Sequence, residues 1–175
     1  MSTPALATRG LNKSFGSLAV TQNVEIAVPQ GARYALIGPN GAGKTTLINL
    51  MTGLIKPDQG AILLNGEDIT TLAPDTRVKR GLTRTFQINQ LFPNLSALEA
   101  VTLAVLERQQ TSGVWWRRLP AFSAAIEEAH EILQSLRFGA DSERVTRELP
   151  YGRQRLLEIA LALATKPKVL LLDEP

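Results

Sequence analysis

Three stretches of the chain repeat apolar residues at the spacing of an amphipathic helix. The first begins after Ser96, and the other two cover residues 122–138 and 151–165. In each, apolar positions lie three and four residues apart. Such spacing lets each helix bury one face. Ser96 with Glu99 three residues later forms a capping-box pattern, which predicts that the first of these helices begins there. The widest apolar stripe belongs to the last stretch and comprises Leu156, Ile159, Ala160, Leu163 and Ala164.

Shorter apolar runs predict strands. Val24, Ile26 and Val28 alternate with polar or small residues, which indicates a half-exposed antiparallel strand. Residues 34–37 and 168–172 are mainly apolar and predict buried strands. The alternation of strands and helices favours an α/β fold. The remaining predicted elements are a second N-terminal strand around Leu6, Thr8 and Leu11, strands over residues 61–64 and 82–86, and a short helix within residues 70–80. Turns are predicted at residues 56–60 and at Asn65-Gly66.

A glycine-rich sequence lies between the first predicted buried strand and a short helical pattern that Gly53 is expected to end. It fits G-x-x-x-x-G-K-[ST], the phosphate-binding P-loop. Glycines let the backbone approach an anion, and successive N–H groups then point into one concavity at a helix N-terminus. Lys44 adds a positive charge for the phosphates, and the Thr45 hydroxyl is placed to bind Mg²⁺. The run is Gly38, Pro39, Asn40, Gly41, Ala42, Gly43, Lys44, Thr45 and Thr46.

Composition narrows the class of protein. The chain has 175 residues, of which 44% are hydrophobic and 20% charged, as expected of one ordinary globular domain. A net charge of +3 is too weak to argue for nucleic acid by itself. There is no cysteine, so no disulfide or thiolate metal site is expected. No run of about 18 apolar residues is present to span a membrane.

Two side-chain groups keep alternative interpretations open at this point. Phe15 could stack on a nucleotide base, although composition alone favours a core phenylalanine. The local basic cluster could contact an acidic partner or phosphates, although a solvated surface is the favoured interpretation. This cluster comprises Arg77, Lys79, Arg80 and Arg84.

A second carboxylate motif follows the last predicted strand. In an open sheet, ligands lie at the carboxyl ends of the strands, so Asp173 would come close to the Mg²⁺ held by Thr45. The next residue, Glu174, could polarise the attacking water as a general base. Beside a P-loop, this run indicates the second half of a nucleotide site.

Together these motifs resemble the ATP-binding subunit of an ABC transporter. Residues 38–45 resemble the family's Walker A motif, residues 169–174 its Walker B motif, and residues 85–87 its Q-loop. Residues 149–155 lie where the family has its signature, usually LSGGQ. The residues around the Q-loop, the Trp-Trp loop at 115–120 and the signature region are similar to the branched-chain amino acid (Liv) group and its urea-type relatives.

The resemblance implies a P-loop NTPase (RecA-like) core with an N-terminal antiparallel β subdomain and an α-helical insert. A single ATP-binding domain would cover residues 1–175, with a β-rich and P-loop part at 1–86, a helical subdomain at 87–150, and the signature helix and Walker B strand at 151–175. Relatives continue beyond Walker B, through a D-loop and a switch histidine. The C-terminal part of the core is therefore expected to be missing, and the chain alone should bind nucleotide weakly and hardly hydrolyse it.

The resemblance also implies roles for individual residues. Phe15 would stack on adenine and Val20 would line the same face, while Lys44 and its P-loop neighbours would hold the phosphates. Gln87 would contact Mg²⁺ or the attacking water, and Glu174 would be the catalytic base. In a head-to-tail dimer, the signature would face the γ-phosphate bound by the other copy. The signature residues concerned are Tyr151, Gly152, Arg153 and Gln154.

The signature departs from the family pattern at Pro150 and at Arg153. Pro150 replaces the serine and can offer a phosphate neither a hydroxyl nor an N–H group. Proline is tolerated in the first turn of a helix, so the helix should survive. Arg153 replaces the glutamine and would add charge near the partner's phosphates.

The implied function is an ATP-hydrolysing subunit that energises uptake of branched-chain amino acids or related small polar solutes. ATP and Mg²⁺ would be its ligands. Its partners would be a second ATP-binding subunit, transmembrane permease subunits and, indirectly, a periplasmic or extracellular solute-binding protein, without nucleic acid. It would lie peripherally on the cytoplasmic side of the cell membrane. The alternatives are a soluble ABC-type ATPase of translation or DNA repair, and a catalytically silent nucleotide-binding fragment.

Overall fold

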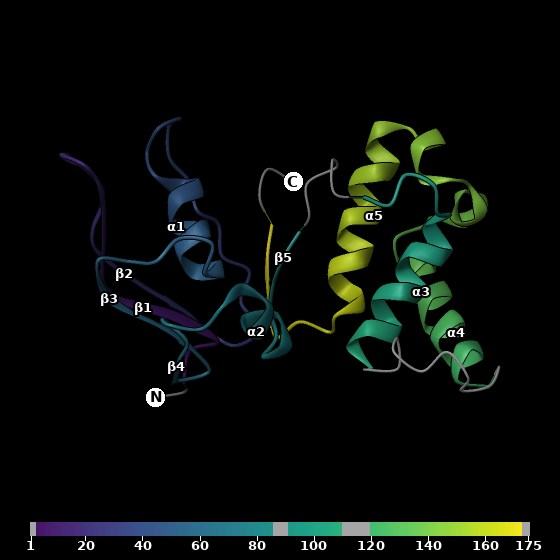
Figure 1. Cartoon of the computed structure of the whole chain (residues 1–175), viewed down its shortest axis with the longest axis horizontal. Helices are drawn as coiled ribbons and strands as arrows, with labels where there is room; N and C mark the ends of the chain where they lie inside the picture. The colour runs from purple at the N-terminus through teal and green to yellow at the C-terminus, as the bar shows by residue number, and fades with distance from the viewer. Residues whose placement is uncertain (1–2, 86–90, 110–119, 173–175) are drawn as a thin grey trace. The chain divides into compact units, whose positions relative to one another are not determined.

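The computed structural model describes residues 3–85, 91–109 and 120–172. It divides into two compact units, Met1–Thr83 and Arg84–Pro175, and each is described by itself. Figure 1 shows the sheet and short helices of the first unit and the helices of the second. Phe86, Gln87, Trp115, Trp116, Asp173 and Glu174, on which several sequence predictions fall, lie outside the described residues.

The first unit is built on a four-stranded antiparallel sheet. Its strands are β1 (Leu6–Phe15), β2 (Leu18–Val28), β3 (Gln59–Leu64) and β4 (Glu67–Asp68), in the order β2-β1-β3-β4. The central strand β1 pairs on both sides, with Leu6 opposite Val28 of β2 and Leu64 of β3. The antiparallel strands predicted for the N-terminal part are confirmed, including the half-exposed alternation along β2.

The turn between β3 and β4 has the chemistry predicted for it. Asn65 and Gly66 both have positive φ, 51° and 85°. Two successive residues of positive φ form the turn whose twist matches that of a two-residue hairpin, and Asn-Gly is the sequence that adopts it most readily. The register of β4 on β3 follows from this turn, with Leu64 opposite Glu67.

Helices α1 (Lys44–Thr52) and α2 (Pro74–Lys79) complete the first unit. Pro74 lies in the first turn of α2, where its missing N–H has no intrahelical partner to lose. Gly53 ends α1 in the left-handed conformation, as predicted. The fully buried apolar side chains of the unit, each at most 3% exposed, come from the sheet, from α1, from the loop after β4 and from the segment after α2: Leu6, Leu11, Leu50, Ile62, Leu64, Ile69 and Leu82.

The buried strand predicted at residues 34–37 does not form, so this prediction was wrong. Tyr34, Leu36 and Ile37 are 61%, 40% and 90% exposed, and no strand is assigned to them. A buried parallel strand depends on hydrogen bonds to its neighbours and on cover over both faces. Within the described parts of the chain, no strand pairs with this run. The apolar character of residues 34–37 was therefore not enough to predict whether they form a strand.

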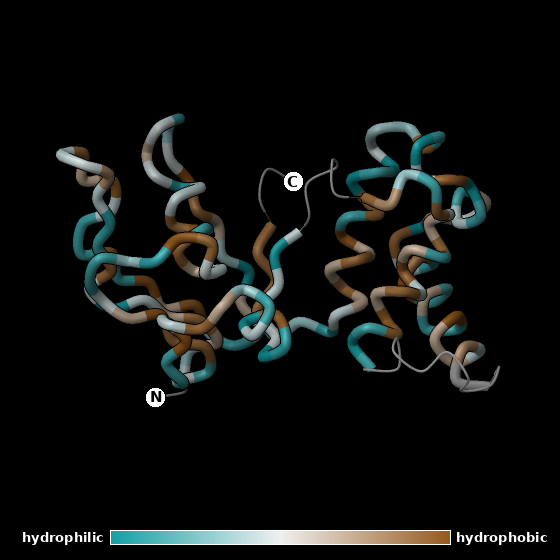
Figure 2. The backbone as a smooth tube through the Cα atoms, viewed as in Figure 1, coloured by the Kyte–Doolittle hydropathy of each residue, from teal (hydrophilic) through white to brown (hydrophobic). Residues whose placement is uncertain are grey.

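The second unit is mainly helical. Its long helices are α3 (Ala97–Arg108), α4 (Pro120–Ser135) and α5 (Tyr151–Ala164), with 3₁₀ turns η2 (Gly139–Glu143) and η3 (Thr146–Glu148) between α4 and α5. Ser96 and Glu99 form the predicted capping box: each side chain accepts from the other's backbone N–H, at 3.2 and 2.8 Å. Figure 2 shows hydrophobic residues interspersed with hydrophilic ones along these helices, as amphipathic packing requires.

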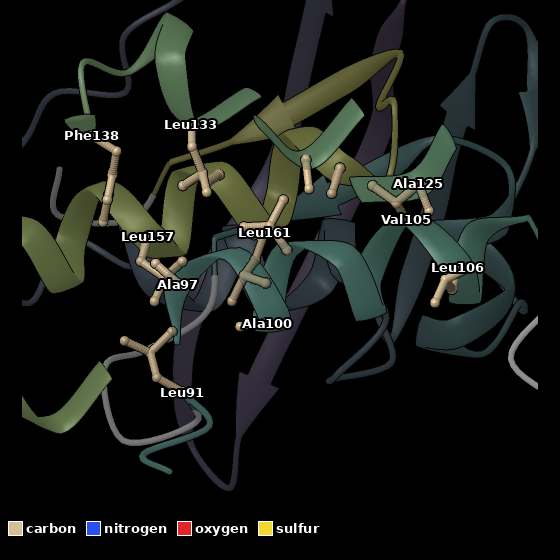
Figure 3. Close-up of a cluster of buried hydrophobic side chains, with 14 of the residues drawn as sticks. Leu91, Ala97, Ala100, Val105, Leu106, Ala125, Leu133, Phe138, Leu157 and Leu161 are labelled. Atoms are coloured by element: carbon tan, nitrogen blue, oxygen red, sulfur yellow. The ribbon is translucent and has the colours of Figure 1, made fainter. Parts of the chain in front are cut away.

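One hydrophobic cluster joins the three long helices. Figure 3 shows Leu157 and Leu161 of α5 in this cluster with Ala97 and Ala100 of α3. The predicted stripe on α5 is correct for Ala160 and Ala164, which are fully buried. Leu156, Ile159 and Leu163 of the same stripe are only half-buried, and Leu156 packs against this cluster. Apolar residues surround much of this helix, and its contacts with α3 and α4, not its own periodicity, decide which of them face inward.

A second sheet pairs β5 (Leu82–Arg84) with β6 (Val169–Leu171). The Thr85 N–H donates to the Leu171 carbonyl at 3.0 Å, just beyond β5. The strands predicted at residues 82–86 and 168–172 are therefore present in shorter form. The residues of β6 are half-buried rather than buried.

Candidate nucleotide-binding site

The P-loop adopts a conformation that depends on its glycines. Gly41 and Gly43 both have φ of 84°, in the left-handed region that other L-residues rarely occupy. The Ala42 N–H donates to the Pro39 carbonyl at 3.2 Å and closes the turn between them. Gly43 is the N-cap of α1 and has no side chain with which to cap it. The first N–H groups of the helix therefore face a region where an anion can accept from them.

Lys44 lies across this loop. Its Nζ donates to the carbonyls of Gly38 and Pro39, at 2.6 and 2.8 Å. An ammonium group has three donors, so one remains for a ligand when both of these bonds are made. The Thr45 side chain next to it is exposed. The residues present thus fit a polyphosphate: a positive charge, free helix N–H groups and a hydroxyl share one end of α1.

Val20 of β2 lies against the P-loop. A Cβ atom placed on Gly43 would lie 3.0 Å from the Val20 carbonyl oxygen and 3.1 Å from its Cγ1. Glycine is therefore required at position 43 for two reasons, its positive φ and this close approach. The contact brings Val20 beside the loop, and its role in lining the nucleotide stays a prediction.

Phe15 lies at the end of β1, beside the β1–β2 turn, and is 49% exposed. It is not a core residue, so that earlier alternative is excluded. Lys13 Nζ lies 5.6 Å from the centroid of the Phe15 ring and also forms a 2.7 Å ion pair with Asp58. Asp58 in turn accepts from the Ser14 N–H at 2.7 Å. The hydrogen bond from Lys13, then that from Ser14, holds the pKa of the Asp58 carboxyl below its ordinary value.

Asp58 thereby ties the end of the β1–β2 hairpin to the turn before β3. The sequence predicts only a turn at this position. Nothing in the local pattern at Asp58 indicated its contact with a hairpin more than 40 residues earlier.

The signature region begins α5 in the second unit. Pro150 is the N-cap residue, and its carbonyl accepts from the N–H groups of Arg153 and Gln154 at 2.8 and 3.0 Å. The prediction that the helix survives Pro150 is confirmed. Tyr151 is 65% exposed, and Gly152 is exposed with no neighbouring atom within 4 Å of an added Cβ.

Arg153 is bound within its own unit. Its Nε forms a 2.9 Å ion pair with Asp141, and its Nη1 donates to the Arg137 carbonyl at 2.8 Å. The guanidinium also lies over the Phe138 ring, 5.5 Å from the centroid. Its predicted place near a partner's phosphates would require these contacts to open, and it stays a prediction. The neighbouring Gln154 side chain donates to the Leu149 carbonyl at 2.9 Å.

The remaining predicted ligands cannot be placed in the site. Gln87, Asp173 and Glu174 lie outside the described residues, so their roles stay predictions. Among the residues that are described, no group of three or more His, Cys, Asp or Glu side chains is arranged to hold a metal ion. None of the described helices is long and apolar enough to cross a bilayer.

A family model decides what this P-loop belongs to. The model for ABC transporters matches residues 21–175, nearly the whole chain. The chain belongs to the ABC transporter family. The ABC assignment covers both units, from β2 of the hairpin to the end of the sequence.

Among characterised relatives in the ABC family, the high-affinity branched-chain amino acid transport ATP-binding protein BraF of Pseudomonas aeruginosa is 37% identical over 182 aligned residues. The corresponding protein LivG of Escherichia coli is also 37% identical. In both cases the alignment covers 100% of this chain and 71% of the relative. The spermidine/putrescine import ATP-binding protein PotA of Legionella pneumophila is 36% identical over 100% of this chain and 44% of its own length.

Solved ABC structures have the same fold. A nucleotide-free ATP-binding cassette from an ABC transporter superposes with a TM-score of 0.81 at 33% identity, over 100% of this chain and 70% of that one. The ATP-binding cassette MJ0796, as a dimer in a post-hydrolysis state with ADP and Pi, gives 0.78 at 25% identity, over 97% and 74%. The predicted α/β P-loop NTPase fold is confirmed.

Arg77 is the main residue of the first unit that sequence reasoning misjudged. It was grouped with Lys79, Arg80 and Arg84 as a basic surface, but it is only 1% exposed. Burial lowers the pKa of its guanidinium below the ordinary value, and the nearby Asp68 carboxylate opposes this shift. An arginine in a short helix with other basic residues carries no local signal of burial, because two of the carbonyls that it binds belong to α1, more than 20 residues earlier.

Glu158 is a second buried charge that was missed. It lies among the apolar residues of α5 and is 2% exposed. Its Oε2 accepts from Arg155 Nη1 at 2.9 Å, while no partner for Oε1 is found in the described part of the chain. Arg155 also lies 5.6 Å from the centroid of the Tyr151 ring, so these three side chains form a row from the signature into the helical core.

Proposed function

We propose that this chain is the ATP-binding and ATP-hydrolysing subunit of an ABC transporter that takes up branched-chain amino acids or related small polar solutes. The observation that carries the proposal is the P-loop at the start of α1, with Lys44 lying over the Gly38 and Pro39 carbonyls. A helix N-terminus with a cation and N–H groups that lack intrahelical partners can hold a chain of phosphates.

The residues of this chain would divide the work on ATP between them. Lys44 and the N–H groups of residues 40–46 would hold the β- and γ-phosphates, since their charge and direction favour an anion. Phe15 would stack on the adenine, with Val20 lining the same face. The exposed part of the Phe15 ring supports this role, because stacking needs an accessible π-face.

Hydrolysis would depend on a second set of groups. The Thr45 hydroxyl, Asp173 and Gln87 would hold Mg²⁺, which neutralises charge on the β- and γ-phosphates when bound. Glu174 would accept a proton from the attacking water, and Gln87 would help to orient that water. These residues offer a hydroxyl, a carboxylate and an amide oxygen, and Mg²⁺ prefers oxygen ligands.

The subunit would act as a dimer with a second ATP-binding subunit, identical or different. The structural likeness to a dimeric cassette that holds ADP and Pi supports this. Tyr151, Gly152, Arg153 and Gln154 of one subunit would meet the nucleotide of the other. The open space around Gly152 supports a close approach there, because a partner's phosphate would encounter no side chain.

The dimer would bind transmembrane permease subunits at the cytoplasmic face of the cell membrane, and a periplasmic or extracellular solute-binding protein would deliver the solute to them. The names of the relatives BraF and LivG support branched-chain amino acids. A polyamine-import relative at 36% identity shows that similarity in this subunit alone does not choose the solute. The permease and the binding protein would make that choice.

The test is an uptake assay in the organism that produces the chain. Lys44→Ala in the chromosomal gene should abolish ATP-dependent uptake of labelled leucine, isoleucine or valine, while labelled putrescine uptake stays unchanged. Lys56→Ala, which removes an exposed lysine just beyond α1, is the matched control and should leave both unchanged. Loss of putrescine uptake alone would reassign the solute, and unchanged uptake of every solute would refute the transport function.

A further inference from the structure

Arg77 forms an unusually complete set of hydrogen bonds for a buried guanidinium. Nη1 donates to the Leu50 and Met51 carbonyls at 2.9 and 2.7 Å. Nε donates to the Leu72 carbonyl at 2.9 Å and Nη2 to the Thr70 carbonyl at 2.7 Å. Every one of these acceptors is a backbone oxygen. The side chain therefore joins two segments of backbone, the last turn of α1 and the loop between β4 and α2.

The position of these acceptors on α1 matters. The last carbonyls of a helix have no intrahelical donor, and they carry the negative end of the helix dipole. Arg77 donates to two such carbonyls, of which Leu50 also accepts from the Gly53 N–H at 3.1 Å, and its positive charge opposes the negative end of the dipole. It also fixes the helix end rigidly, because the guanidinium is a planar fork whose donors point in set directions.

Gly53 leaves the space that Arg77 fills. A Cβ atom on Gly53 would lie 2.8 Å from Arg77 Nε, 3.0 Å from Cζ and 3.1 Å from the Leu72 carbonyl oxygen. Gly53 also has φ of 83°, which a side chain would strain. The absence of a side chain at Gly53 thus makes room for the Arg77 guanidinium against the end of α1.

We propose that Arg77 is a positioning residue for the phosphate-binding loop, acting through α1. Helix α1 has nine residues, so it is about 13 Å long and its two ends move as one body. Lys44 and the phosphate-facing N–H groups lie at its N-terminus, and Arg77 holds its C-terminus. A helix released at one end can tilt, and its N–H groups then no longer converge on one anion. This inference rests on the proposed nucleotide site.

The direct test measures phosphate binding in matched variants of the full chain. Arg77→Lys keeps the charge but replaces the planar fork by a single ammonium, which cannot reach four carbonyls. Leu11→Ala is the control, because Leu11 is fully buried on β1 and belongs to neither α1 nor its cap. The probes are Mg²⁺ with inorganic tripolyphosphate and Mg·ATP, at temperatures where both variants are equally folded by circular dichroism.

Arg77→Lys should weaken the binding of both probes about five- to twentyfold, and Leu11→Ala should change it less than twofold. Equal affinity in all three proteins, or equal losses in the two variants, would overturn the positioning role. If the wild type binds neither probe, the nucleotide site itself is refuted as well, so the two failures are distinguishable.

A second measurement uses the wild type alone and does not depend on whether a variant folds. If the clamp favours phosphate binding, phosphate binding must stabilise the clamp by the same free energy. The Nε–H of Arg77, followed by NMR, should exchange with solvent several-fold more slowly when tripolyphosphate is added. An exchange rate that is unchanged at saturation would contradict the proposal.

Discussion

Replacing Glu128 by glutamine should destabilise the helical unit, and the loss should depend on pH. The Glu128 carboxylate pairs with Arg108 through two 2.7 Å hydrogen bonds and with Lys166 at 2.9 Å. Arg108 also donates to the Ala164 carbonyl at 2.9 Å, so the network joins α3, α4 and the end of α5. The Arg108 and Glu128 side chains are each only 19% exposed, which makes this pair stronger than a surface ion pair.

The magnitude follows from the pKa of Glu128. The hydrogen bond from Arg108, assisted by that from Lys166, lowers it from 4.5 to about 2. Each pKa unit corresponds to about 1.4 kcal/mol, so the network contributes about 3 kcal/mol of stability at neutral pH. The folded pKa is depressed, so this contribution is fully present above pH 4.5 and is lost as the pH falls towards 2. At pH 3 about 1 kcal/mol should remain.

The assay is urea unfolding of wild type and Glu128→Gln, followed by circular dichroism at 222 nm at pH 7 and at pH 3. Glu127→Gln is the matched control, because Glu127 is exposed on the same helix and undergoes the same chemical change. We expect Glu128→Gln to lower the free energy of unfolding by about 3 kcal/mol at pH 7, and by about 2 kcal/mol less at pH 3. A difference below about 0.5 kcal/mol at pH 7, or one that does not shrink on acidification, would refute this reasoning.

Three further substitutions test other parts of the structure. Ser96→Ala should lower the free energy of unfolding in urea by about 1 kcal/mol, because the capping box with Glu99 is lost. An unchanged free energy would show that the cap does not stabilise the helix. Leu161→Ala should cost about 2 to 4 kcal/mol and Leu163→Ala clearly less; the reverse order would contradict the observed phase of α5. Phe15→Ala should weaken Mg·ATP binding by about 1 to 3 kcal/mol in calorimetry and leave tripolyphosphate binding unchanged, whereas equal losses would exclude stacking on the base.

Local sequence signals predicted the parts of the fold that local chemistry determines. The Asn65-Gly66 turn, the Ser96 cap and the glycines of the P-loop each depend on residues a few positions apart, so a single pattern was sufficient. The prediction that the helix tolerates Pro150 was also correct, because the effect of a proline at a helix start does not depend on residues elsewhere in the chain.

The features that the sequence did not reveal depend on residues far apart in the chain. Arg77 is buried because the carbonyls of Leu50 and Met51, more than 20 residues earlier, lie where its guanidinium can reach them. Residues 34–37 needed a neighbouring strand that no local pattern can supply. The buried face of α5 differs from the predicted stripe because the helix is apolar on several sides, and packing against α3 and α4 determines which side is buried.

The most direct test of the nucleotide site is isothermal titration of Mg·ATP into the wild-type chain, Lys44→Ala and Lys56→Ala. We expect saturable binding to the wild type and to Lys56→Ala, and at least tenfold weaker binding to Lys44→Ala, a loss of about 1.4 kcal/mol or more. Equal affinity of the two lysine variants, or no binding to the wild type, would contradict the assignment of the P-loop as the phosphate site.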